Sequence, residues 1–282
     1  HRDQKASYDP DPVIVAGLGA DVPTSPAAGQ FNVDEFYGEI RLPILSDVPF
    51  FNKLELDGAV RHSNYSSFGS NTTFTASGLW KPVADLLLRG GYAESLRAPS
   101  IGELYAGLSR TDATLTDPCT SAAGGLFQSN ATVRANCIAN GVPANGSYAE
   151  DVSQIGVFSR GSSTLKPETA TTWTAGAVYS PAWARDSFAS AFSIELNYYD
   201  IELKNAIASV PALFTLQRCY FNANPLSCAS ITRSPNGSVA GISGVLQNLN
   251  AIETSGLDAS LIYRSRPIGS GTVGLTLSLI HI

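Results

Sequence analysis

Alternating hydrophobicity in eight segments is the feature that most restricts how this chain can fold. The segments run over residues 33–42, 53–62, 72–80, 85–97, 168–179, 189–203, 250–263 and 271–280. In each segment one residue parity is mostly apolar, and the other holds small, polar and charged side chains. Because successive side chains of a β-strand point to opposite faces, the pattern predicts strands with one apolar and one polar face.

The segment over 168–179 shows the pattern clearly. Trp173, Ala175, Ala177 and Tyr179 share one parity. Through the middle of all eight segments the apolar rows contain no charged residue. The opposite parity holds Glu35, Glu39, Arg41, Glu55, Asp57, Arg61, Arg89, Glu195, Asn197 and Asp258, with Leu79, Leu87 and Ile262 as apolar exceptions.

Two environments suit a charge-free row of this kind, namely the core of a soluble β-sandwich and the acyl chains of a bilayer. Segments of about ten residues exceed the usual five or six of soluble sheets and match a tilted membrane-spanning strand. A charge facing lipid costs roughly 2–4 kcal/mol at mid-bilayer, so selection would leave such rows uncharged. We therefore favour lipid and keep the sandwich as the alternative.

The connections between the segments favour a meander. Short ones, such as "KPVA" and "SPAWARDSF", alternate with longer ones, of which 98–167 and 204–249 are the longest. Short turns at one end and long loops at the other are typical of outer-membrane barrels. Three segments end in an aromatic residue with a proline close behind, at Trp80, Tyr179 and Tyr263. This indicates an aromatic girdle at a membrane interface, although strand ends and turns of any β protein use the same residues.

Composition excludes several classes of protein. Charged residues make up 15% of the chain, against roughly 25% in soluble domains. A net charge of −6 argues against a nucleic-acid partner, which would require a basic surface. No run approaches the roughly 18 apolar residues of a membrane-spanning helix, so a barrel is the remaining route across a bilayer.

The four cysteines form two close pairs. Cys119 and Cys137 are 18 positions apart, and Cys219 and Cys228 are 9 apart. Both pairs lie in loops rich in Gly, Pro, Asn and Ser, which favours local disulfides formed in an oxidising compartment such as the periplasm. A metal site is the weaker interpretation, because none of the three histidines lies near a cysteine pair.

Four ordered stretches resemble the barrels of TonB-dependent receptors. They are "VDEFYGEIRLPILSDVPFFNKLELDGAVRHSNYSSFGS", "WKPVADLLLRGGYAESLRAPSIGELY", "LKPETATTWTAGAVYSP" and "NLNAIETSGLDASLIYR". Together they cover most of the chain outside the cysteine-bearing loops. The resemblance implies a barrel of roughly 22 strands whose lumen holds an N-terminal plug, and it implies import of a scarce ligand across the outer membrane of a Gram-negative bacterium.

We expect residues 1–282 to form a partial barrel domain of this kind. The fold class is all-β, an antiparallel up-and-down transmembrane β-barrel with about eight strands of a larger barrel, and hence an open curved sheet in isolation. Both ends of the sequence read as cuts, and no plug domain or coupling segment is recognisable. Residues 1–32, 98–167 and 204–249 are expected as extracellular loops.

Candidate ligand-binding residues lie where the fourth segment ends and in the long loops. Long loops on a rigid scaffold commonly carry recognition. Arg97 could contact ligand or plug, or pair with a neighbouring carboxylate, and the loop aromatics could stack on a ligand or pack the loops. The candidates are Arg97, Glu103, Tyr105, Phe127, Tyr148 and Tyr220.

The expected function is receptor and importer activity rather than catalysis. The ligand would be a siderophore, a vitamin or a carbohydrate, and the expected partners are outer-membrane lipid, the receptor's own plug and the TonB energy-coupling complex. We expect no cofactor, metal or nucleic acid. A secreted β-sandwich binding module is the principal alternative. A β-rich hydrolase using carboxylates such as Glu35 and Asp57 is a smaller one.

Overall fold

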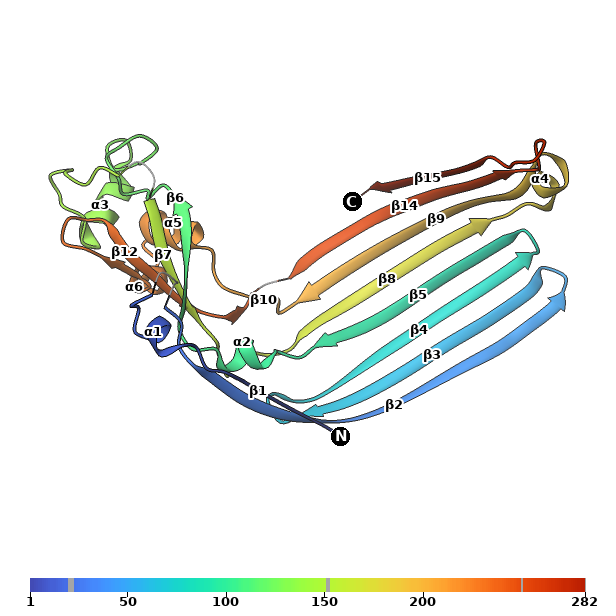
Figure 1. Ribbon diagram of the computed structural model, residues 1–282, viewed down its shortest axis with the longest axis horizontal. Helices are drawn as coiled ribbons and strands as arrows, with labels where there is room; N and C mark the ends of the chain where they lie inside the picture. The colour runs from blue at the N-terminus through green and yellow to red at the C-terminus, as the bar shows by residue number, and fades with distance from the viewer. Residues whose placement is uncertain (20–22, 151–152, 250, 282) are drawn as a thin grey trace.

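The computed structural model of the chain describes residues 1–19, 23–150, 153–249 and 251–281. Its main feature is one curved antiparallel sheet of nine strands in the order β1-β2-β3-β4-β5-β8-β9-β14-β15 (Figure 1). The strands are β1 (Arg2–Tyr8), β2 (Ala27–Val48), β3 (Phe51–Tyr65), β4 (Gly69–Val83), β5 (Leu86–Arg97), β8 (Glu168–Tyr179), β9 (Ala189–Lys204), β14 (Ile252–Ser265) and β15 (Gly274–His281).

The sheet is an up-and-down meander, as predicted. Neighbouring strands are consecutive in the chain except where the two long loops intervene, before β8 and before β14. Within the described ranges β1 and β15 do not pair, so the sheet is open. The all-β class and the partial, unclosed barrel architecture are confirmed.

The two long loops lie at one end of the sheet, together with the three-residue turn between β3 and β4 (Figure 1). The opposite end has short connections alone. These are the turn between β2 and β3, the turn between β4 and β5, helix α4 (Ala182–Ser187), and the turn between β14 and β15. Val48 pairs with Phe51, so β2 and β3 meet in a two-residue turn in which Phe50 has a φ of 65°. Several strands extend beyond the predicted segments. β2, for example, runs over Ala27–Val48, where the hydrophobic pattern predicted a strand over 33–42.

Strand β1 is a correction to the sequence prediction, which gave residues 1–32 as a loop. Arg2–Tyr8 pairs with Ala27–Val33 at the start of β2. In the segment RDQKASY one parity is wholly polar and the other begins with Arg2 and Gln4, so the segment has no apolar row that would indicate a strand. Backbone pairing with β2 forms the strand without an apolar row.

The apolar face of the main sheet is uncovered. Trp173 is 57% exposed and Leu277 is 55% exposed, and Leu275 is exposed as well. Among the described residues the two other sheets are small and belong to the long loops, and neither packs on these rows as a sandwich would require. Charges of this parity lie near the loop end of the strands, at Asp34, Glu94, Asp200, Glu202, Lys204 and Glu253, and on β1 at Asp3 and Lys5.

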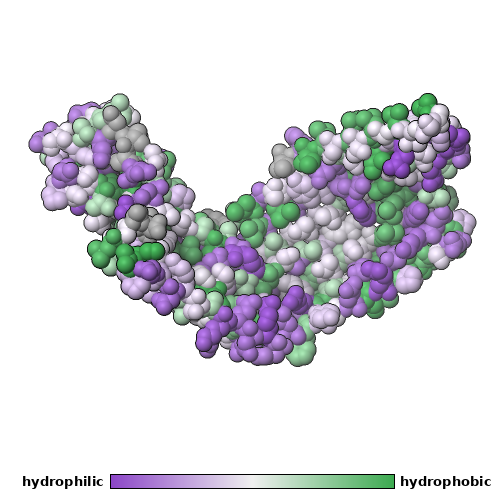
Figure 2. Space-filling view, viewed as in Figure 1, coloured by the Kyte–Doolittle hydropathy of each residue, from purple (hydrophilic) through white to green (hydrophobic). Residues whose placement is uncertain are grey.

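The polar face lines a trough. In Figure 2 the hollowed surface of the sheet shows mainly hydrophilic and intermediate residues.

The longest helix in the described ranges, α5 (Ala212–Asn222), has 11 residues. No described helix is long and apolar enough to cross a bilayer.

The two long loops fold together into a subdomain that the sequence did not predict. Its elements are α2 (Ile101–Tyr105), β6 (Ser109–Leu115), α3 (Ala131–Ala139) and β7 (Ser153–Arg160) from the first loop, and β10 (Ile207–Ala208), α5, α6 (Pro225–Ala229), β11 (Ile231–Arg233), β12 (Val239–Val245) and β13 (Gln247–Asn248) from the second. A short helix, α1 (Pro12–Val15), precedes β2. β12 pairs in parallel with β7, which joins the two loops in one four-stranded sheet.

Strands β4 and β5 separate towards the loop end. β4 pairs with β3 from Lys81 to Gly69, its loop end, but its pairing with β5 ends at Thr75 and Ala93. β5 instead stays paired with β8 up to Arg97 and Glu168. Residues 70–74 and 94–97 consequently face each other without a ladder, and the Glu94 carboxylate accepts the Phe74 N–H at 3.2 Å.

The apolar face yields a first prediction. Leu196 lies on that face of β9, and Ser260 lies on the polar face of β14 opposite Glu195. In lipid vesicles Leu196→Arg should lower the free energy of unfolding by about 2–4 kcal/mol, because the guanidinium would face acyl chains. Ser260→Arg, the matched control, should change it by less than about 1 kcal/mol. Urea titration followed by tryptophan fluorescence measures both, and equal losses would contradict a lipid-facing role for Leu196.

Candidate ligand-binding surfaces

Ion pairs between strands cover the polar face of the main sheet. Arg41 of β2 lies opposite Asp57 of β3, with 3.0 Å between Nε and Oδ2. Arg61 lies 2.7 Å from the Glu35 carboxylate, which also accepts the Ser63 hydroxyl at 2.8 Å. The arginines are about half exposed or more, so each pair contributes little to stability. Their effect is to present a polar wall with few unpaired cations.

Arg89 forms a bridge across three strands. Its guanidinium donates to Glu195 and, at 2.7 Å, to Asn197 Oδ1, both on β9, although β8 lies between. Gly176 of β8 is the residue opposite both Arg89 and Asn197. A Cβ at Gly176 would lie 2.5 Å from Asn197 Oδ1 and 3.0 Å from Arg89 Nε. The bridge therefore depends on glycine at this position.

Arg97 and Glu103 are brought together at the loop end of the sheet. Arg97 donates to Glu103 at 2.9 and 3.0 Å and also to Glu168 of β8. Ser100 caps α2 by accepting the Glu103 N–H, while Glu103 accepts the Ser100 N–H in a reciprocal capping box. Burial alone would raise the pKa of the Glu103 carboxyl, but hydrogen bonds from Arg97 and Ser100 outweigh it and lower the pKa below its ordinary value.

Helix α2 lies against the polar face of β2. The Tyr105 ring occupies the space where a side chain at Gly29 would be. Leu104 is buried in a small apolar cluster with Phe31 and Val33 of β2. Tyr105 thus packs at the mouth of the trough, apart from the other candidate aromatics.

The other three candidate aromatics lie in the core of the loop subdomain. Phe127, Tyr148 and Tyr220 are buried there with Val133, Leu216 and both disulfides. This corresponds to the packing alternative that the sequence left open. Direct ligand contact by any of the six candidates stays a prediction.

Both predicted disulfides are formed. Cys119 bonds to Cys137 and Cys219 bonds to Cys228, and the described residues include no free cysteine. Each bond ties a helix to a neighbouring segment of its own loop. Asn130 begins α3 by accepting the Thr132 and Val133 N–H groups, and Asn224 caps α6 ahead of a proline.

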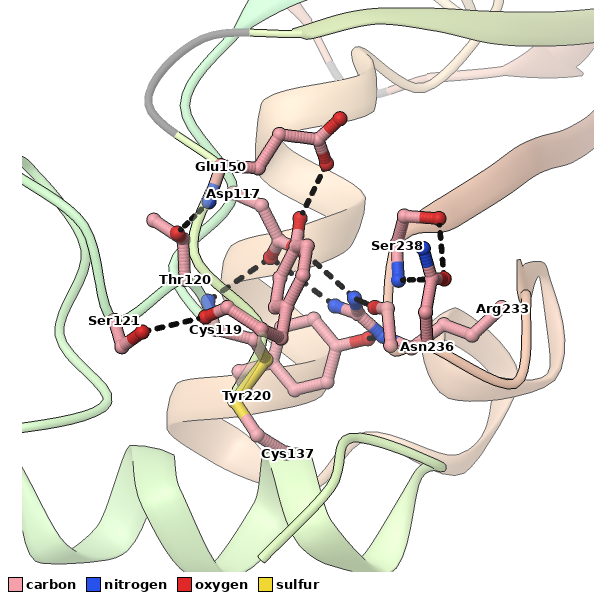
Figure 3. A network of polar contacts seen from close by, with 12 residues as sticks. Asp117, Cys119, Thr120, Ser121, Cys137, Glu150, Tyr220, Arg233, Asn236 and Ser238 are labelled. Carbon is pink, nitrogen blue, oxygen red and sulfur yellow. Dashed lines mark hydrogen bonds and ion pairs between the residues drawn. A yellow bond between two sulfur atoms is a disulfide. The ribbon is translucent and has the colours of Figure 1, made fainter. Parts of the chain in front are cut away.

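A buried ion pair joins the two loops (Figure 3). Arg233 of β11 contacts Asp117 of the first loop at 2.7 and 3.1 Å, and their side chains are only 3% and 1% exposed. Arg233 also donates to the Tyr220 hydroxyl at 2.9 Å. The Asp117 carboxylate in turn accepts the Cys119 N–H, beside the first disulfide.

Tyr148 completes this network. Its hydroxyl lies 3.0 Å from both Asp117 Oδ2 and Glu150 Oε2, and the Arg233 guanidinium lies over its ring. Burial and the Asp117 carboxylate raise the pKa of Tyr148 well above its ordinary value. Burial opposes the charge of Arg233, but the Asp117 carboxylate outweighs this, so the pKa of Arg233 is raised. Arg233 therefore keeps its charge, and Tyr148 stays a neutral phenol, across the physiological range.

The family comparison matches the architecture described above. The family described as TonB-dependent receptor-like β-barrel matches residues 2–280. The chain belongs to this family.

Within the part of the barrel that the structure describes, no three His, Cys, Asp or Glu side chains are grouped in a way that could hold a metal ion.

Solved structures of siderophore receptors share the fold of this TonB-dependent receptor barrel. One is the siderophore receptor PirA from Pseudomonas aeruginosa, with a TM-score of 0.52, 14% identity, and coverage of 90% of this chain and 35% of that one. Another is a ferric enterobactin receptor (PfeA) mutant from Pseudomonas aeruginosa in complex with enterobactin, with a TM-score of 0.52, 16% identity, and coverage of 89% and 27%. The chain spans about a third or less of the length of these receptors.

Sequence reasoning missed Asp117, Arg233 and Glu168 of this receptor barrel. Asp117 and Arg233 are 116 positions apart in two irregular loops, and nothing in the local sequence pairs them. The position of Glu168 could have been predicted. Glu168 begins the predicted strand 168–179, and Arg97 ends the predicted strand 85–97 that precedes it in the meander. Antiparallel pairing of those two strand ends would have brought the two side chains together.

The buried ion pair of this receptor gives a second prediction. Arg233→Met leaves Asp117 buried without a countercharge and should destabilise the loop subdomain by about 3–5 kcal/mol. Arg110→Met removes an exposed pair with Asp112 and should cost less than about 1 kcal/mol. Hydrogen exchange of the α3 and α5 amides measures both changes. Similar protection in the two variants would contradict a stabilising role for the buried pair.

Gly176 of the receptor wall gives a third prediction. Gly176→Val should displace Arg89 and lower the free energy of unfolding by about 1–2 kcal/mol. Gly90→Val, where a Cβ meets only ordinary contact, is the matched control and should have less effect. In an Arg89→Met background the loss from Gly176→Val should shrink, as a double-mutant cycle in urea measures. An unchanged loss in that background would show that the bridge is not the cause.

Proposed function

We propose that this chain forms part of the wall of an outer-membrane receptor that imports a scarce small molecule with energy supplied through TonB. The observation that carries the proposal is the uncovered apolar face of the main sheet. Its rows are uncharged through the middle of the strands and lie opposite a polar trough. Such a wall separates lipid from an aqueous passage, which an importer requires and a sandwich module does not.

The loop subdomain supports a receptor role. Loops 98–167 and 204–249 lie at one end of the sheet, where we propose that they face the cell exterior (Figure 1). Disulfides and a buried ion pair hold them as one rigid surface at the mouth of the trough. The proposed partners are outer-membrane lipid, the plug domain of the whole receptor and the TonB complex.

The proposed ligand belongs to the siderophore, vitamin or carbohydrate classes. Two of the structural relatives are a siderophore receptor and a ferric enterobactin receptor, which supports transport of a scarce ligand without deciding its chemistry. Arg97, Glu103 and Tyr105 are proposed to hold α2 at the entrance that the ligand passes. The chain is proposed to bind and pass its ligand unchanged, without catalysis.

Gene deletion tests the proposal. Deleting the gene for this chain in its native bacterium should abolish growth on one limiting nutrient from an array of iron–siderophore complexes, cobalamins and carbohydrates. Deleting TonB should abolish growth on the same nutrient. Ample supply of a small nutrient that enters through porins and meets the same requirement should restore growth of both strains. Unchanged growth of the receptor deletion on the whole array, or TonB-independent growth on the affected nutrient, would contradict the proposal.

A further inference from the structure

Helix α4 lies between β8 and β9, at the end of the main sheet that has short connections (Figure 1). Phe188 directly follows the helix, and its ring centroid lies 6.0 Å from those of both Phe192 of β9 and Tyr263 of β14. Phe192 and Tyr263 are opposite each other in the sheet and belong to its apolar parity. The connection that contains α4 is therefore packed on the lipid side of the wall, away from the trough.

Trp183 of α4 belongs to the same aromatic cluster. Its ring centroid lies 6.1 Å from that of Phe188, and its indole N–H donates to the Tyr179 hydroxyl at 3.3 Å. Trp183 is nevertheless 57% exposed. Amphipathic rings of this kind are enriched where acyl chains meet headgroups. The cluster therefore sets the depth at which α4 meets the bilayer.

The strands beneath this cluster all have their neighbours in place. β8 lies between β5 and β9, β9 lies between β8 and β14, and β14 lies between β9 and β15. Further strands of a complete barrel would extend the sheet at its edges, and a plug would occupy the trough on the opposite face. In an outer-membrane barrel the cluster is therefore covered by lipid.

Two arginines meet at the last turn of α4. Arg266, from the turn between β14 and β15, donates to the Arg185 carbonyl at 2.6 Å. The Arg185 guanidinium lies 3.8 Å from the Asp85 carboxylate and is 51% exposed. Asp85 also accepts the Ala182 N–H at 3.0 Å. A guanidinium carries more N–H donors than these contacts use, so both arginines can still bind oxygens of a ligand.

The charge around α4 is positive, although the whole chain carries a net charge of −6. Residues 182–187 and 264–273 contain three arginines and one acid, which are Arg185, Arg264, Arg266 and Asp186. Cations exceed acids even when Asp85 is included. Guanidinium groups bind phosphate oxygens through paired N–H donors, and basic residues at a membrane surface attract anionic lipids. The phosphate of an anionic headgroup is therefore the ligand that fits this position.

We propose that α4 and the turn between β14 and β15 bind the phosphodiester headgroup of an anionic glycerophospholipid. Arg185 and Arg266 bind the phosphate oxygens, while Trp183 and Phe188 contact the acyl chains next to the headgroup. The site lies on the outside of the barrel and is separate from the passage proposed for the imported molecule. It rests on the part of the proposed function that places the wall in lipid, and not on transport.

Fluorescence quenching by brominated lipids tests this site, because bromine on an acyl chain quenches a tryptophan that the lipid contacts. The variant Trp80→Phe/Trp173→Phe leaves Trp183 as the only tryptophan. It is reconstituted in vesicles of phosphatidylcholine and phosphatidylglycerol in equal amounts, with one lipid or the other brominated. Trp183 should prefer phosphatidylglycerol by about fivefold or more in relative binding constant, and high salt should reduce this preference. Adding Arg185→Gln/Arg266→Gln should lower the preference to less than about twofold.

The same chain offers two matched controls. Trp80→Phe/Trp183→Phe leaves Trp173, which is also 57% exposed on the apolar face but lies opposite Asp200. This tryptophan should show no preference for phosphatidylglycerol. Lys53→Gln/Lys81→Gln removes two cations from the polar face at the same end of the sheet and should leave the preference at Trp183 unchanged.

Three outcomes would overturn the headgroup site. They are equal quenching of Trp183 by the two brominated lipids, a preference that survives the loss of both arginines, and an equal loss in the lysine control. Quenching of Trp173 by either lipid reports that the wall faces acyl chains, so a failure at Trp183 alone would leave the receptor wall intact. A lack of quenching at both tryptophans would contradict the lipid-facing wall and this site together.

Discussion

Backbone pairing between neighbouring strands is the constraint on which the rest of this structure depends. A bilayer offers no water to N–H and C=O groups, so strands that cross it must satisfy one another. Once β2 to β15 pair in one register, the side-chain period of two sends every second residue to the same face. The uncharged rows and the ion pairs across the polar face are two results of that single arrangement. A slip by one residue would turn Arg41 and Arg89 towards lipid.

Salt bridges have different effects in the wall and in the loop subdomain. Arg41 and Arg61 are exposed to solvent, so their pairs add little stability and mainly leave few free cations in the trough. The pair of Asp117 and Arg233 is buried, and either charge without the other would be costly. The loops therefore hold a fixed arrangement through a contact that requires both of them to be folded.

The sequence predicted the parts of this structure that local periodicity determines. The eight amphipathic segments became strands, and the two close cysteine pairs became disulfides. Strand β1 was missed because pairing with β2, and not an apolar row, forms it. Phe127, Tyr148 and Tyr220 were ligand candidates because the sequence of a loop does not show whether an aromatic side chain is exposed or buried. They are buried in a core formed by both loops, which the pairing of β7 with β12 joins. The sequence of either loop alone does not show that pairing.

The separation of β4 from β5 links the loop subdomain to the wall. Arg97 ends β5 and contacts Glu168, which holds the end of β5 to β8. The chain after Arg97 then turns inward, and α2 packs over Gly29 of β2. With β5 held on one side, β4 keeps only its pairing with β3, and the Glu94 carboxylate takes the N–H of Phe74 that a ladder would otherwise satisfy. The separation at this position is therefore a product of where the first loop leaves the sheet, so the path of that loop also shapes the neighbouring part of the sheet.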